Sequence, residues 1–335
     1  MYRPAENDDA DTAVTTGTKT SVTVRVVLSA MIVAMAITAP ATVRAQGETE
    51  MATETPPKPE PSKSGRIEAN GVNYYYEIHG EGEPLLLLHG GLGSIDMFGP
   101  VLPALAQTRQ VIGVDLHGHG RTPLSGRPID LLDIGDDLAV VLDELEYDSV
   151  DVMGYSFGGG AALRLAIQHP EVVRRLVIVS AGYAREGYFP ELIPMQEAVS
   201  SAMADQMKGT PMYESYEAIA PNPDEFPDLL DAMGAFMRKP YDWTEEVKTL
   251  EMPVMLVYGD SDMLQLEHVV KFYKLLGGGL KDAGWQREHM SQNRLAILPD
   301  LTHYEAFFAP ELVTTVLPFL NGERRVMSWA DQVGK

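Results

Sequence analysis

The sequence Gly-Tyr-Ser-Phe-Gly at residues 154–158 constrains the fold of this chain more than any other segment. The mostly apolar residues 150–153 before it indicate a strand, and the small and apolar residues 159–167 after it indicate a helix. A sharp strand-to-helix turn strains the backbone of Ser156, and glycines two residues to either side avoid a steric clash. The turn therefore presents a serine hydroxyl at the end of a sheet, beside a helix N-terminus that favours negative charge.

The composition limits the class of protein to which the chain belongs. Its 335 residues, of which 45% are hydrophobic, suffice for one large globular domain or two small ones. The absence of cysteine excludes disulfides, thiolate nucleophiles and cysteine-ligated metal sites. The formal net charge of −22 argues against nucleic acid and anionic membrane surfaces as partners, because binding to phosphate groups needs a basic surface.

The N-terminal segment has the three-part layout of a secretory signal. Residues 26–39 form a mostly apolar, uncharged run that follows Arg25, and a short segment ending in Ala45 offers a cleavage position. The run is shorter than the ~20 residues that a membrane-spanning helix needs, and an uncleaved N-terminal anchor is the alternative. Residues 1–45 are thus predicted to export the protein to the periplasm or the medium. Residues 46–64, rich in Pro, Glu, Thr and Ser, are predicted to be a disordered linker.

Short apolar segments alternate with helical patterns through the rest of the chain. Residues 65–78 indicate a hairpin that turns at Asn70-Gly71. Further strands are predicted at residues 84–88, 110–115, 176–180, 253–258 and 294–298. Helical patterns, notably at residues 130–145, lie between them. Strands that alternate with helices predict an α/β fold with a mostly parallel central sheet flanked by helices on both faces.

Residues 183–249 interrupt the alternation, because they have helical periodicity and no convincing strand. An insertion of about 65 residues is too long for a plain loop, so we predict a helical cap over the strand ends. The α/β core then comprises residues 65–182 and 250–322, and a tail follows at 323–335. The insertion is rich in methionine and aromatic residues; most should pack the cap onto the core, and a few should face the substrate. We assign substrate contacts to Leu92, Tyr155, Tyr188, Met233 and Met237.

A glycine-rich loop after one apolar strand supplies groups that a nucleophilic serine needs. This loop reads His-Gly-Gly-Leu-Gly at residues 89–93. A backbone N–H from such a loop, and another from the residue after the serine, can stabilise the oxyanion of a tetrahedral intermediate. We predict Gly91 and Phe157 as the two donors, with Leu92 as the alternative to Gly91. His89 is expected to hold the loop in place and not to react.

Two later segments supply an acid and a base. The sequence Tyr-Gly-Asp-Ser-Asp at residues 258–262 offers two aspartates at a predicted strand end. We predict that Asp262 orients the catalytic histidine, with Asp260 as the alternative and otherwise a turn former. His303 follows the last predicted strand in a polar loop and is the predicted base.

In these features the chain resembles the α/β-hydrolase superfamily, and specifically its cap-bearing branch of small bacterial esterases, lactonases and perhydrolase-like enzymes. The resemblance covers nearly all of residues 66–320, and the order serine, aspartate, histidine along the chain is that of the family. The matching segments are residues 89–91, 115–122, 154–158 and 259–262, together with His303. The histidines of segment 115–122, His117 and His119, are expected to be structural, and no metal site is predicted there.

The resemblance implies a serine hydrolase that cleaves a carboxylic ester or lactone of a small, largely apolar substrate through an acyl-enzyme, without a cofactor. A serine at residue 156 argues against epoxide hydrolase and haloalkane dehalogenase chemistry, which in this family uses an aspartate there. Carbon–carbon bond hydrolysis and cofactor-free peroxidase or perhydrolase chemistry with the same triad are alternatives. A non-catalytic small-molecule receptor is a third. The sequence predicts no partner other than the substrate and does not indicate an oligomeric state.

Overall fold

The computed structural model describes residues 60–323 and Trp329. The predicted signal at residues 1–45 lies outside the described residues, as do most of the predicted linker and most of the predicted tail. Within the described ranges, no helix combines the length and the apolar character that crossing a membrane requires.

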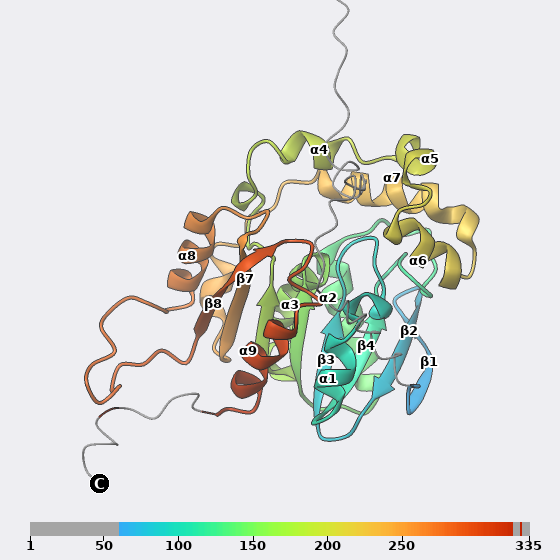
Figure 1. Ribbon diagram of the computed structural model, residues 1–335. Coiled ribbons are helices and arrows are strands. Elements are labelled where there is room, and N and C mark those ends of the chain that lie inside the picture. The colour runs from blue at the N-terminus through green and yellow to red at the C-terminus, as the bar shows by residue number, and fades with distance from the viewer. Residues whose placement is uncertain (1–59, 324–328, 330–335) are drawn as a thin grey trace, which may run out of the picture. The chain divides into compact units, whose positions relative to one another are not determined.

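The strands of the described residues form one eight-stranded sheet in the order β1-β2-β4-β3-β5-β6-β7-β8 (Figure 1). β2 runs antiparallel to both β1 and β4, and the remaining neighbours are parallel. The mostly parallel sheet predicted from the sequence is therefore confirmed. The strands are β1 (Lys63–Ala69), β2 (Val72–His79), β3 (Glu83–Leu88), β4 (Arg109–Asp115), β5 (Val150–Tyr155), β6 (Val173–Val179), β7 (Val254–Ser261) and β8 (Arg294–Thr302).

Local sequence explains the turn of the β1–β2 hairpin, and strand pairing explains where β1 begins. Its turn contains Asn70 and Gly71, whose φ angles of 50° and 86° suit a tight turn that only such residues adopt readily. β1 begins at Lys63, so the strand extends two residues into the segment 46–64 that the sequence predicted as linker. The reason is that Lys63 and Ser64 continue the backbone pairing with Ile78 and Glu77, which residue type alone does not reveal.

Helices cover both faces of the sheet. α1 and α9 contact each other, lie in front of the sheet in Figure 1, and contribute to one apolar core with the side chains of Leu85 and Leu87 in β3. α2 and α3 contact each other as a second pair, and α3 contacts β3, β5 and β6. The helices and 3₁₀ turns of the core are η2 (Ile95–Phe98), α1 (Val101–Ala106), α2 (Leu131–Glu144), α3 (Phe157–Gln168), η3 (Pro170–Val172), α8 (Leu266–Leu275) and α9 (Pro310–Leu320).

The segment between β6 and β7 consists of short helices and contains no strand of the sheet (Figure 1). Its longest helix, α7, buries Phe226, Leu229, Leu230 and Met233, a spacing that places these four side chains on one helix face. α7 contacts α4, α5 and α6. The elements are η4 (Arg185–Gly187), α4 (Ile193–Glu197), η5 (Ser201–Met203), α5 (Ala204–Met207), α6 (Pro211–Ile219), η6 (Pro223–Glu225), α7 (Phe226–Met237) and η7 (Glu246–Thr249).

The chain enters and leaves this helical segment at adjacent positions. The N–H of Arg185 donates to the carbonyl of Tyr241 at 3.0 Å, and the N–H of Trp243 donates to the carbonyl of Tyr183 at 2.9 Å. Two backbone hydrogen bonds thus hold the two connections together, in the manner of a short antiparallel pair. The helical segment therefore begins and ends at neighbouring positions.

Candidate active site

The predicted strand-to-helix turn is present between β5 and α3, with Ser156 at its apex. Ser156 has φ 52° and ψ −116°, a conformation that non-glycine residues rarely adopt. A Cβ atom on Gly154 would lie 2.1 Å from the carbonyl oxygen of Gly158, and one on Gly158 would lie 2.4 Å from the carbonyl oxygen of His89. Side chains at either position would force the turn apart, so the two glycines hold the serine in its strained geometry.

Three side chains from separate strand ends meet in a hydrogen-bonded relay. Ser156, Asp262 and His303 are each the first residue after a parallel strand, namely β5, β7 and β8. Nε2 of His303 lies 3.0 Å from Oγ of Ser156, and Nδ1 of His303 lies 2.9 Å from Oδ1 of Asp262. A carboxylate only accepts, so Nδ1 carries the proton and Nε2 is left to accept from the serine hydroxyl.

Asp262 is buried, and its environment favours the charged form. Burial raises its pKa, but the hydrogen bond and charge of His303, with hydrogen bonds from Ser180 and the N–H of Met263, outweigh burial and hold the pKa below its ordinary value. Asp260, the alternative acid, is exposed, and its carboxylate accepts from the N–H of Asp300 at 3.2 Å. Asp262 is thus the aspartate that contacts the histidine.

The loop at residues 89–93 lies against the N-terminus of α3. A Cβ atom on Gly91 would lie 3.7 Å from Cβ of Phe157, so the two predicted oxyanion donors are neighbours. Phe157 is the first residue of α3, where a backbone N–H has no partner within the helix. Within residues 60–323, the N–H of Gly91 donates to no protein acceptor. Two N–H groups are therefore available beside Ser156.

His89 fixes the shape of this loop. Its Nδ1–H donates to the carbonyl of Gly90 at 2.8 Å, and its Nε2 accepts from the N–H of Leu116 at 2.9 Å. Burial lowers the pKa of His89 to about 4, so the ring is neutral at physiological pH. Leu92, the alternative donor, has a φ of 57°, and the N–H of Gly93 closes the turn on the carbonyl of Gly90. His89 thus holds the loop in place, as expected from the sequence.

The predicted substrate residue Tyr155 has a different place in the structure. Its side chain is 4% exposed, its hydroxyl donates to the backbone carbonyl of His303 at 2.8 Å, and its ring packs against His303 and Phe307. The prediction that Tyr155 lines the substrate site is therefore corrected. The residue lies in the apolar core and packs against His303 from that side. The physical reason is strand alternation, which turns the residue before the serine into the core.

The other predicted substrate residues come from the helical segment or its connections. Met233 of α7 is buried, and its Cε would lie 3.1 Å from a Cβ atom on Gly91. Met237, one turn later on the same helix, is partly buried. Tyr188 is also partly buried and shares a hydrogen bond with Tyr241, and its pKa is raised first by burial and then by the nearby charge of Asp262. Met233 and Tyr188 therefore both lie close to the proposed reacting groups.

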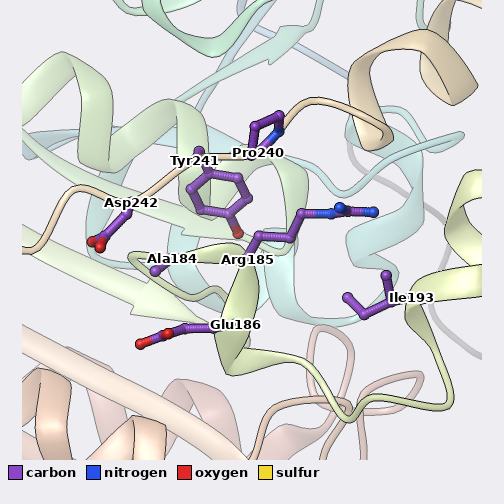
Figure 2. Close-up of a pocket in the computed structure, with 7 residues that line it drawn as sticks. All are labelled: Ala184, Arg185, Glu186, Ile193, Pro240, Tyr241 and Asp242. Atoms are coloured by element: carbon purple, nitrogen blue, oxygen red, sulfur yellow. The ribbon is translucent and has the colours of Figure 1, made fainter.

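A pocket of about 340 Å³ lies where the chain enters and leaves the helical segment (Figure 2). Figure 2 shows the ring of Tyr241 above the side chain of Arg185, which extends towards Ile193. The pocket contains none of the predicted catalytic residues, but Tyr241 connects it to Tyr188 and so to the neighbourhood of Asp262. Its lining residues are Ala184, Arg185, Glu186, Ile193, Pro240, Tyr241 and Asp242.

Two contributors to the site were missed in the sequence analysis. Ser180 donates a 2.5 Å hydrogen bond to Oδ2 of Asp262, and the ring of Phe236 meets that of Phe157 edge-on at 5.2 Å. Ser180 was predicted only as the end of a strand. Its position was a usable signal, because polar residues at the carboxyl ends of parallel strands gather at one edge of a sheet.

Histidines near the site make backbone and ring contacts. Among residues 60–323, no cluster of histidine, aspartate and glutamate side chains is arranged to hold a metal ion. Nε2 of His117 accepts from the N–H of Ser125 at 3.0 Å, and the ring of His119 stacks on Phe157. These contacts agree with the structural role expected for both histidines.

A family model described as the alpha/beta hydrolase fold matches residues 83–214. The chain is 32% identical over 277 residues to a 2-hydroxymuconate semialdehyde hydrolase from Pseudomonas sp. (strain CF600), with coverage of 68% of this chain and 97% of that relative. It is 28% identical over 246 residues to a pimeloyl-[acyl-carrier protein] methyl ester esterase from Neisseria meningitidis serogroup B, with coverage of 67% and 89%. A thermophilic esterase from Thermogutta terrifontis has the same fold, with a TM-score of 0.61 at 18% identity over 78% of this chain and 99% of that one.

Proposed function

The chain belongs to the α/β hydrolase family, and from this premise we propose that it is a serine hydrolase that cleaves a carboxylic ester or lactone of a small, largely apolar substrate. The observation that carries the proposal is the relay in which Ser156 Oγ, 3.0 Å from His303 Nε2, is linked through His303 to Asp262. This arrangement suits a serine that attacks a carbonyl carbon.

In the first half of the proposed reaction, Ser156 forms a bond to the carbonyl carbon while His303 takes the hydroxyl proton on Nε2. Asp262 keeps the ring in the required tautomer and stabilises the imidazolium ion that results. The carbonyl oxygen becomes an oxyanion, which the N–H groups of Gly91 and Phe157 are positioned to receive. Loss of one such donor typically raises the barrier by roughly 3–4 kcal/mol.

In the second half, the tetrahedral intermediate collapses and the alkoxide leaves with the proton that His303 carries. Water then gives a proton to His303 and attacks the acyl-enzyme, and a second collapse releases the acid and restores the Ser156 hydroxyl. Every proton moves through the same imidazole nitrogen. The proposed steps use the substrate, water, the three side chains of the relay and the two backbone N–H groups.

The character of the substrate follows from the side chains near the relay. Met233 lies close to Gly91 and Phe236 packs against Phe157, so apolar side chains flank the two proposed oxyanion donors, which favours an apolar acyl or alcohol group. Similarity to a relative that is named as a methyl ester esterase supports the choice of an ester bond.

A test of the nucleophile uses a fluorophosphonate probe, which reacts stoichiometrically with an activated serine. We expect the purified protein to be labelled at Ser156 and the Ser156→Ala variant to remain folded, unlabelled and inactive, with a loss of about 10⁴-fold or more in turnover. Ester hydrolysis that persists in that variant would refute the assignment. An unlabelled wild-type protein would instead favour a non-catalytic receptor.

Carbon–carbon bond hydrolysis is the second candidate function. It is favoured by the 32% identity to a protein that is named as a 2-hydroxymuconate semialdehyde hydrolase. A panel of p-nitrophenyl esters, lactones and vinylogous diketones separates the two candidates on one enzyme preparation. Faster turnover of the diketones than of every ester and lactone would assign the second function.

We further propose that the protein is exported, on the basis of the apolar run at residues 26–39 and the small residue Ala45 that follows it. Expression of the full chain in a bacterial host, followed by fractionation and N-terminal sequencing, tests this. We expect a mature protein that begins at residue 46 in the periplasm or the medium. Retention in the membrane fraction with residues 1–45 intact would support the anchor instead.

A further inference from the structure

A serine outside the proposed triad lies beside the acid. Ser180 is the first residue after β6 and is fully buried. Its hydroxyl donates a 2.5 Å hydrogen bond to Oδ2 of Asp262, the carboxylate oxygen that does not contact His303. The two oxygens of one carboxylate thus have different partners, a histidine on one side and a serine on the other.

The backbone of Ser180 repeats that of Ser156 one strand further along the sheet. Ser180 has φ 53° and Ser156 has φ 52°. The N–H of Ser156 donates to the carbonyl of Val179, and the N–H of Ser180 donates to the carbonyl of Val257, both at 2.9 Å. Glycine adopts a positive φ at less cost than serine. The backbone conformation at residue 180 therefore gives no reason for a serine in place of glycine. The feature that serine adds is its hydroxyl group.

We propose that Ser180 is a positioning residue that fixes the orientation of the Asp262 carboxylate, and through it the ring of His303. The inference rests on the proposed function, because it takes Asp262 and His303 as acid and base. Oδ1 of Asp262 accepts from His303 and from the N–H of Met263 at 2.7 Å. With Oδ2 held by Ser180, both oxygens are fixed and the carboxylate cannot rotate away from the imidazole.

The groups around Asp262 set the direction of the expected change with pH. His303 is the titratable side chain that acts on Asp262, and the charge of Asp262 in turn acts on four tyrosines, namely Tyr155, Tyr188, Tyr258 and Tyr304. Burial raises the pKa of each tyrosine, so all four are neutral in the working range. Removal of the Ser180 hydroxyl leaves the carboxylate charge less stabilised. The carboxylate then attracts protons more strongly, so the acidic limb of the activity profile should move to higher pH.

The main test compares the wild-type protein with Ser180→Gly, which suits the backbone and removes the hydroxyl. We expect kcat/KM for a p-nitrophenyl ester to fall roughly ten-fold. The acidic limb of its pH profile should move upwards by about half a pH unit or more. The melting temperature should fall modestly, because the loss of a hydrogen bond to the buried carboxylate outweighs the relief of the positive φ at residue 180. Ser62→Ala is the matched control, because it removes a hydroxyl that donates to the carbonyl of Ile78 in the edge hairpin. This control should leave the pH profile unchanged.

Two readouts do not depend on the substrate. One is the rate of Ser156 labelling by a fluorophosphonate as a function of pH, and the other is the proton NMR resonance of Nδ1–H of His303. Ser180→Gly should slow the labelling and shift or broaden the resonance. Ser180→Cys, which retains the volume but donates weakly, should give intermediate values.

The outcomes separate this proposal from the proposed function. A folded Ser180→Gly variant with wild-type resonance, labelling rate and acidic limb overturns the positioning role. A wild-type protein that cleaves no ester or lactone counts against the proposed function, and Ser180 is then judged by the resonance and the labelling. A lower melting temperature with an unchanged acidic limb also overturns the proposal, because it indicates a purely structural serine.

Discussion

The hydroxyl of Tyr155 donates a 2.8 Å hydrogen bond to the backbone carbonyl of His303, a residue 148 positions later in the chain. The ring centroids of the two residues are 5.2 Å apart. Tyr155 directly precedes Ser156, so the bond ties the strand that carries the nucleophile to the loop that carries the base. The distance between Ser156 and His303 therefore depends on a side chain that packs in the apolar core.

Replacement of Tyr155 by phenylalanine tests the role of this hydrogen bond. The variant leaves the carbonyl of His303 without a partner in the core, which should cost about 1–3 kcal/mol of the free energy of unfolding. Because the loop of His303 gains freedom, we also expect kcat to fall several-fold while KM changes little. Urea unfolding and steady-state kinetics measure both effects. Tyr147→Phe removes a hydroxyl that donates to Gln110 at 2.7 Å and should lower stability alone. Equal kcat values for wild type and Tyr155→Phe would contradict the argument.

The glycine at residue 154 offers a steric test of the turn. In Gly154→Ala the new Cβ would lie 2.1 Å from the carbonyl oxygen of Gly158, so the strand-to-helix turn must distort. We expect a loss of about 3 kcal/mol or more in stability, or failure to fold. Gly126→Ala is the control, because no atom lies within 4 Å of its Cβ position and its φ is not positive. Thermal melts of the two variants should differ widely, and similar melting temperatures would disprove the steric account.

The buried histidines predict the response of stability to acid. Burial lowers the pKa of His89 to about 4 and that of His119 to about 3, whereas both have a value near 6.5 in the unfolded chain. Between these values the unfolded state binds more protons than the folded state. Stability should therefore fall as the pH is lowered from about 6.5 towards 4, with each histidine adding about 1.4 kcal/mol per pH unit at most.

Urea unfolding at a series of pH values measures the slope of the unfolding free energy against pH. His119→Gln removes one of the titrating groups and should make the slope between pH 6.5 and 4 shallower. The matched change His289→Gln removes an exposed imidazole and tests whether any lost histidine has the same effect. A slope in His119→Gln as steep as in the wild type would show that the buried imidazoles do not control acid stability.

Met233, whose side chain lies close to Gly91, provides a test of substrate selection. Met233→Ala removes the side chain whose Cε approaches Gly91, so apolar contact with the substrate should be lost next to the reacting carbonyl. We expect KM for esters with longer acyl chains to rise about ten-fold, with less change for acetate esters. Met290→Ala, on the surface of the segment after α8, is the control and should leave every KM unchanged. A uniform effect on all chain lengths would argue that Met233 supports the fold only.

The parts of the fold that sequence predicted are those that neighbouring residues determine. The turn around Ser156 needs glycines at residues 154 and 158, and the hairpin needs Asn70-Gly71, because backbone sterics act over a few residues. Buried strands such as 84–88 were recognisable because burial on both faces requires a continuous apolar run. The start of β1 at Lys63 was not, because it depends on pairing with β2 and not on residue type.

Within the candidate site, sequence supplied the residue types and their order, and tertiary structure decided their partners. Ser156, Asp262 and His303 stood out because each follows a predicted strand, and parallel strands deliver their carboxyl ends to one edge. The choice of Asp262 over Asp260, the inward orientation of Tyr155 and the contact between Ser180 and Asp262 all join segments that lie far apart in the chain. Such contacts depend on strand order and register, which no local pattern of residues contains.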